Sequence, residues 1–218
     1  MIKEKFGDRL DDLVRALFPF LFWRPLNPNL LSLLGALVSV GAASAFLAGD
    51  LRTGGWLMIA SGFFDLVDGA VARHNGTAST FGAFLDSTLD RVSEGALYAG
   101  LAYFYFTRTR TATVWMRGMF EGSAEWGDAD GPTLGVLALA VLILSFLVSY
   151  ARARAEGLGL ECKVGIMERP ERVLTLGAGA LLGHRFMPGA LGILFVLTLV
   201  TVLQRVYHVR KVTRTDSA

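Results

Sequence analysis

The chain has 218 residues, of which 53% are hydrophobic and only 18% charged, and its mean hydropathy is +0.47. This composition excludes a disordered chain, a secreted disulfide scaffold and most soluble enzymes. The single cysteine, Cys162, excludes an internal disulfide, and the net charge of +2 gives no reason to expect a nucleic-acid partner. We therefore expect one domain over residues 1–218, an all-α integral membrane protein.

The first 24 residues differ from the rest of the chain. Phe6, Leu10, Leu13 and Leu17 recur at helical spacing, and charged residues lie between them. This pattern predicts an amphipathic helix over residues 1–24 that lies in the membrane interface. It lacks the apolar run and small-residue cleavage site of a signal peptide, so we do not expect one.

Six later stretches predict membrane-spanning helices, each of which needs about 20 mostly apolar residues. The fifth stretch is short and glycine-rich, so its helix must extend at either end. Together the six predict a helical bundle over residues 29–209. They are Asn29–Ala48, Gly55–Ala72, Phe81–Phe106, Leu134–Ala153, Val173–His184 and Leu191–Val209.

The distribution of Lys and Arg predicts the orientation of this bundle. Of the 21 basic residues, all but five fall at the termini or on the same side of the predicted bundle. The positive-inside rule then places both termini and that side in the cytoplasm, in the cell membrane. The five exceptions are Arg52, Arg108, Arg110, Arg117 and Arg185.

Two consecutive predicted spans contain four aspartates, which ordinary spans avoid. Asp65 and Asp68 are three residues apart, and Asp86 and Asp90 are four apart, so each pair shares a helical face. A short turn joins the two helices, so the pairs can face each other at the cytoplasmic end. Charged groups inside a membrane helix usually serve a function. A single aspartate here would more simply pair with an arginine, but four at this spacing predict a site.

Four converging carboxylates without histidine or cysteine suit a hard divalent cation such as Mg²⁺, Mn²⁺ or Ca²⁺. Two such ions could lie side by side between shared carboxylates. Small residues near the acids permit close approach of a helix or a flat ligand, and Arg73 could hold a phosphate. These small residues are Gly69, Ala72, Gly82 and Ala83.

The residues from Asp65 to Asp90 resemble the signature of the CDP-alcohol phosphotransferase (CDP-alcohol phosphatidyltransferase) family. All fixed positions of its DGxxAR-type pattern are present at the right spacing: Asp65, Asp68, Gly69, Ala72, Arg73, Gly82, Asp86 and Asp90. The resemblance implies a membrane enzyme that transfers a phosphatidyl or analogous group from a CDP-linked lipid to an alcohol and releases CMP. It also implies a homodimer.

The same resemblance implies roles for individual residues. Asp65, Asp68 and Asp86 would ligate two divalent ions, Mg²⁺ or Mn²⁺. Asp90 would also contact metal and would be the base that deprotonates the acceptor. The CDP-lipid would be bound by Asn29, Asp68, Gly69, Ala72, Arg73 and Gly82.

Arginines near the cytoplasmic ends of the later spans favour an anionic, phosphorylated acceptor. Arg152 and Arg154 end the fourth span, Arg172 opens the fifth, and Arg205 interrupts the last apolar run. Topology alone also explains basic residues at these ends, where they can touch lipid headgroups. Their function is therefore open on the residues alone.

The segments SYARARAE and ERPER are similar to the phosphatidylinositol phosphate synthase branch of the family. That likeness implies inositol 1-phosphate as the acceptor. The pocket for it would contain Ser149, Arg152, Arg154, Pro170, Arg172 and Arg205.

Three alternatives stay open. The chain could be a phosphatidylglycerophosphate synthase, because the acceptor motif is short. It could be an archaetidylinositol phosphate synthase, because the motifs do not distinguish diacylglycerol from archaeal ether-lipid donors. As a non-enzyme, it could be a small divalent-cation transporter that uses the aspartates as its ion site.

Overall fold

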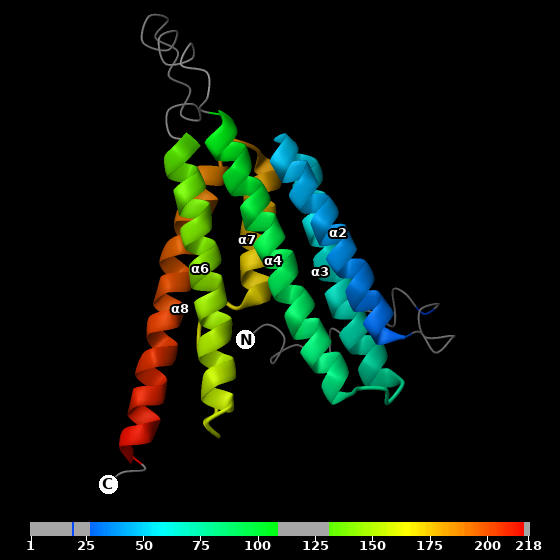
Figure 1. Cartoon of the computed structure of the whole chain (residues 1–218), viewed down its shortest axis with the longest axis vertical. Helices are drawn as coiled ribbons and strands as arrows, with labels where there is room; N and C mark the ends of the chain where they lie inside the picture. Colours follow the sequence, from blue (N-terminus) through cyan, green and yellow to red (C-terminus); the bar gives the residue numbers. More distant parts are fainter. Residues whose placement is uncertain (1–18, 20–26, 109–130, 216–218) are drawn as a thin grey trace, which may run out of the picture.

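The computed structural model describes residue 19 and residues 27–108 and 131–215. Except for Pro19, the amphipathic helix predicted over residues 1–24 lies outside the described residues. The described part is built from helices, which Figure 1 shows side by side. They are α2 (Pro28–Ala48), α3 (Leu51–His74), α4 (Thr80–Arg108), α6 (Gly131–Glu156), α7 (Arg169–Leu182) and α8 (Met187–Thr215).

The turn between α2 and α3 shows how local sequence sets the helix ends. The backbone of Gly49 ends α2 with a positive φ of 86°, a conformation that favours glycine. Asp50 then begins α3, because its side chain accepts a hydrogen bond from the Thr53 backbone N–H at 3.1 Å. This two-residue connection makes α2 and α3 antiparallel neighbours.

The six helices pack in a closed ring. Going round the bundle, α2 contacts α3, α3 contacts α7, α7 contacts α8, α8 contacts α6, α6 contacts α4 and α4 contacts α2. Gly100 permits the last of these contacts, because a Cβ there would lie 2.5 Å from the backbone oxygen of Ala43. Most of the ring interior is apolar, with Phe46, Leu101 and Leu194 fully buried.

The predicted all-α class is confirmed, and five of the six predicted spans are helical throughout; the fifth, Val173–His184, is helical only to Leu182, where α7 ends before its cap residue Gly183. In the part of the chain that the structure describes, four helices are long and apolar enough to cross a membrane: α2, α3, α6 and residues 187–214 of α8. The other two differ for physical reasons. α4 is long but carries charged residues such as Asp86 and Glu94, and α7 has only 14 residues. The fold is thus that of a multi-pass helical membrane protein with four candidate spans.

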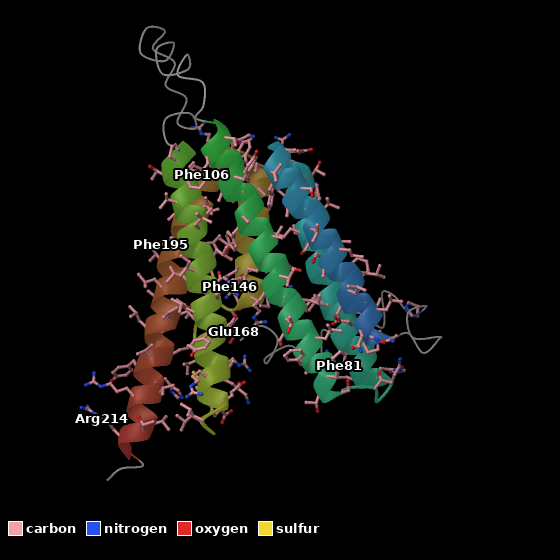
Figure 2. All side chains as sticks on the ribbon, in the orientation of Figure 1. Phe81, Phe106, Phe146, Glu168, Phe195 and Arg214 are labelled. Atoms are coloured by element: carbon pink, nitrogen blue, oxygen red, sulfur yellow. The ribbon has the colours of Figure 1, made fainter. Side chains whose placement is uncertain are left out.

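Most residues predicted to form the site lie on the halves of the helices that point toward one end of the ring, the lower end in Figure 1. The carboxyl-terminal halves of α3, α6 and α8 and the amino-terminal halves of α2, α4 and α7 supply them. Figure 2 labels Phe81 near the start of α4 and Glu168 immediately before α7, both in the lower half of the molecule. Because all six of these helices contribute, residues far apart in sequence meet here.

Candidate active site

The aspartates of α3 and α4 converge as their spacing predicts. Asp65, Asp68 and Asp86 each offer one carboxylate oxygen, and these oxygens all lie within 4.8 Å of one another. Ser32 of α2 donates a hydrogen bond to Oδ2 of Asp68 at 2.5 Å and so fixes that carboxylate. Three oxygen ligands at this separation, without histidine or cysteine among them, fit Mg²⁺ or Mn²⁺.

Asp90 lies beside this group rather than in it. Its Oδ1 accepts from Nη1 of Arg169 at 2.8 Å, and the same Nη1 lies 2.9 Å from Oδ2 of Asp65. Arg91 approaches Asp90 more loosely, at 3.5 Å. Arg169 therefore links the carboxylates of two helices from a third helix, α7.

Arg169 is a site residue that the sequence analysis did not assign. The available signal was its place in the ERPER segment, directly before Pro170, which is predicted to line the acceptor pocket. Nothing in the sequence places the start of α7 against α3 and α4. That proximity comes from the ring, in which α7 packs on α3.

A cavity of about 170 Å³ lies between α2, α3 and the start of α4; we call it the α2-side cavity. Gly82 borders it closely, since a Cβ there would lie 3.1 Å from Oδ1 of Asn29. At Gly69 a Cβ would lie 3.1 Å from the Arg73 guanidinium. All six residues predicted to bind the CDP-lipid line this cavity: Asn29, Asp68, Gly69, Ala72, Arg73 and Gly82.

A second cavity of about 170 Å³, the α6-side cavity, also borders the aspartates. Asp65 and Asp90 form part of its wall. Five of the six predicted acceptor residues line it: Ser149, Arg152, Pro170, Arg172 and Arg205. The sixth, Arg154, is exposed and is not among the lining residues. The cavity also takes in Arg91, Glu94, Glu168 and Arg169, so five arginines and four acids surround one space.

Like Arg169, Arg172 and Arg205 are held by other groups of the protein. Arg172, with 2% of its surface exposed, donates from Nε and Nη2 to the two carboxylate oxygens of Glu94 at 2.7 and 3.2 Å. Arg205 donates to the backbone oxygens of Val164 and Val148. Arg152 instead pairs with Glu156 at 2.8 Å on an exposed helix face, where an ion pair contributes little.

A sequence model described as CDP-alcohol phosphatidyltransferase matches residues 26–204. The chain belongs to this family. The match includes the aspartates of α3 and α4 and nearly all residues that line the two cavities. The resemblance found on the motif from Asp65 to Asp90 is therefore confirmed over most of the chain.

Relatives and solved structures extend this result. The archaetidylinositol phosphate synthase of Methanothermobacter thermautotrophicus is 39% identical over 188 residues, 84% of this chain and 83% of the relative. The phosphatidylinositol phosphate synthase of Mycobacteroides abscessus is 36% identical over 190 residues, 84% of this chain and 77% of the relative.

The phosphatidylinositol phosphate synthase of Mycobacterium tuberculosis has a similar structure. Its crystal structure with CDP-DAG bound superposes with a TM-score of 0.69 at 29% identity and covers 92% of each chain. Its complex with manganese and citrate gives 0.70 at 30% identity and covers 92% of this chain and 88% of that one.

Proposed function

We propose that this CDP-alcohol phosphatidyltransferase transfers the phosphatidyl group of CDP-diacylglycerol to inositol 1-phosphate and releases CMP, a step of phospholipid biosynthesis. The observation that carries the proposal is the α6-side cavity. There the side chains of five arginines surround a space that also contains Asp90. Such a cavity suits a phosphorylated polyol. The names of the relatives support the same acceptor.

We infer that Mg²⁺ or Mn²⁺ is the cofactor, held by Asp65, Asp68 and Asp86, with Asp90 as a further ligand and two ions per site. The close approach of three carboxylate oxygens supports this, as does the manganese complex of the M. tuberculosis relative. Bound divalent ions would neutralise the diphosphate and stabilise the leaving CMP.

The donor occupies the α2-side cavity in this proposal. Gly69, Ala72 and Gly82 leave room for the flat cytosine ring, and Asn29 offers polar atoms at its edge. Arg73 follows the same helical face and provides a fork of donors for the diphosphate. The donor phosphorus then lies near the aspartates, between the two cavities.

Asp90 acts as the general base. It accepts the proton of the acceptor hydroxyl, whose oxygen attacks the phosphorus bonded to the lipid. That P–O bond forms while the P–O bond to CMP breaks, and CMP leaves with the electron pair. Arg169 contacts Asp65 and Asp90 and so orients both carboxylates.

The acceptor phosphate is bound in the α6-side cavity by Arg152 with Ser149, Arg172 and Arg205 around it, and Pro170 shapes the wall. Arg154 lies two residues further along α6 on a different, exposed side of the helix and would join only by reorienting its long side chain. The ion pair of Arg152 with Glu156 is exposed, so exchanging that carboxylate for a ligand phosphate costs little.

The proposal also includes how the chain is arranged in the membrane. We infer a single catalytic unit over residues 1–218, with six spanning helices and an interfacial helix over residues 1–24. Both termini and the active site lie on the cytoplasmic side of the cell membrane. Two copies form a homodimer. The excess of basic residues at the end that holds the site supports this orientation.

The donor lipid has two candidates, because the relatives include an archaetidylinositol phosphate synthase. Purified protein with Mn²⁺ and inositol 1-phosphate should be supplied with CDP-diacylglycerol or with its archaeal ether analogue. Mass spectrometry then identifies the lipid product. We expect phosphatidylinositol phosphate from the ester donor. Product from the ether donor alone would contradict the phosphatidyl assignment while leaving the acceptor assignment in place.

A further inference from the structure

The segment between α6 and α7, residues 157–168, leads directly into the site. Its last residues are Met167 and Glu168, and Arg169 follows at the start of α7. Glu168 and Arg169 line the α6-side cavity, and Arg169 also contacts Asp65 and Asp90. The position of the Met167 backbone therefore determines where the side chains of Glu168 and Arg169 start from the main chain.

The backbone of Met167 is held from both sides. Its N–H donates to Oγ1 of Thr201 on α8 at 3.0 Å, and its carbonyl oxygen accepts from Nη1 of Arg172 at 3.0 Å. Arg172 is in turn held by the two oxygens of Glu94 on α4. Met167, Thr201 and Arg172 are all buried, so water does not replace a lost partner easily.

The Thr201 hydroxyl is oriented for this task. It donates its own hydrogen to the carbonyl of Leu197 at 2.8 Å, which leaves a lone pair for the Met167 N–H. Gly165 packs against the Thr201 methyl group, since a Cβ there would lie 2.5 Å from Cγ2. One turn further along α8, Arg205 holds the carbonyl of Val164 at 2.8 Å.

We propose that Thr201 and Glu94 are positioning residues of the active site, which act through the backbone of Met167 and through Arg172. Together they fix the end of segment 157–168 and so aim Glu168 and Arg169 into the α6-side cavity. Thr201 does not line that cavity, so its influence on the acceptor passes through Met167. The part that concerns acceptor binding rests on the proposed function; the structural part does not.

Cys162 can report how often residues 157–168 open. Cys162, the single cysteine of the sequence, lies within residues 157–168 and is fully buried. Its rate of reaction with a maleimide therefore measures how often the segment opens, whatever the enzyme binds.

Thr201→Val removes the hydroxyl and keeps the shape. Thr198→Val is the matched control: Thr198 is equally buried one turn earlier on α8, and within the described residues its hydroxyl has no hydrogen-bond partner. We expect Thr201→Val to speed Cys162 labelling about fivefold, the effect of losing one neutral hydrogen bond. The KM for inositol 1-phosphate should rise by a similar factor while the KM for CDP-diacylglycerol stays constant. Thr201→Ser, which restores the hydroxyl, should behave as the parent.

Glu94→Gln is the second variant, for use if Thr201→Val fails to fold. It keeps the shape of the partner of Arg172 and weakens the charge-assisted bonds, so labelling should again accelerate. Labelling rates that match those of Thr198→Val in both variants would overturn the proposal. Faster labelling in an enzyme that does not use inositol 1-phosphate would uphold the structural part and overturn the proposed function instead.

Discussion

Asp90 lines the α6-side cavity but lies outside the group of three aspartates whose oxygens meet. As the proposed base, it should be needed for turnover and not for folding. Asp90→Asn should lower kcat by about 10²–10⁴-fold, the usual contribution of a general base. CMP release measures this effect, and size-exclusion chromatography checks the fold.

Asp50→Asn is the control, because Asn also caps a helix and Asp50 begins α3, at the opposite end from Asp65 and Asp68. Near-parental turnover of Asp90→Asn would place the base elsewhere.

Arg152 lines the α6-side cavity and forms an exposed ion pair with Glu156. Arg152→Ala should raise the KM for inositol 1-phosphate about tenfold or more, because a charge-assisted hydrogen bond to phosphate is lost. The KM for the CDP-lipid should not change. Arg210→Ala removes the same charge from an exposed position on α8 and is the control. Equal effects of the two variants would attribute the change to net charge and contradict a specific contact.

The sequence predicts some of these residues and not others for a clear reason. Asp65 with Asp68 and Asp86 with Asp90 follow helical spacing, so their convergence needs only two helices and one turn. Glu94 and Arg172 are 78 positions apart, and their contact depends on how the ring closes. In the sequence Thr201 is an ordinary polar residue of an apolar helix, and only the structure shows that it contacts Met167.

At the scale of elements, the contact between α2 and α4 depends on Gly100. A Cβ at this position would meet the backbone of Ala43, which cannot turn aside as a side chain can. Gly100→Ala should therefore lower the free energy of unfolding by about 1–3 kcal/mol, as overpacking commonly does. Thermal unfolding in detergent measures the loss.

Gly192 provides the comparison, because nothing lies within 4 Å of a Cβ built there on α8. Gly192→Ala should be neutral or stabilise the protein by about 0.5–1 kcal/mol through its better helix propensity. Equal destabilisation by both variants would contradict this account, because the loss would then not depend on the close approach of α2 and α4.

The helices themselves follow from the sequence, and their membrane roles follow less directly. Apolar runs predict α2, α3, α6 and α8 to within a few residues at most ends. α4 and α7 have weaker signals, because the site places charges on α4 and because α7 is short. The charges of the site thus obscure the apolar pattern on α4, and the short length of α7 weakens the pattern there.

At the scale of the whole molecule, six spans would place α8's end and the turn between α2 and α3 on opposite sides of the membrane. Single cysteines at Arg210 and Arg52, introduced after Cys162→Ser, test this arrangement. We expect an impermeant maleimide added to intact cells to label Arg52→Cys, and Arg210→Cys only after lysis. The reverse pattern would invert the orientation, and labelling of both in intact cells would contradict an even number of spans.

Acceptor-dependent CMP release tests the central claim most directly. The purified protein should be supplied with CDP-diacylglycerol and Mn²⁺ and offered inositol 1-phosphate, inositol, glycerol 3-phosphate or serine in turn. Because the α6-side cavity is lined by arginines, we predict CMP release with inositol 1-phosphate and little with the uncharged or zwitterionic acceptors. Preference for glycerol 3-phosphate would contradict the proposed acceptor, and metal transport without CMP release under any condition would contradict the proposed reaction itself.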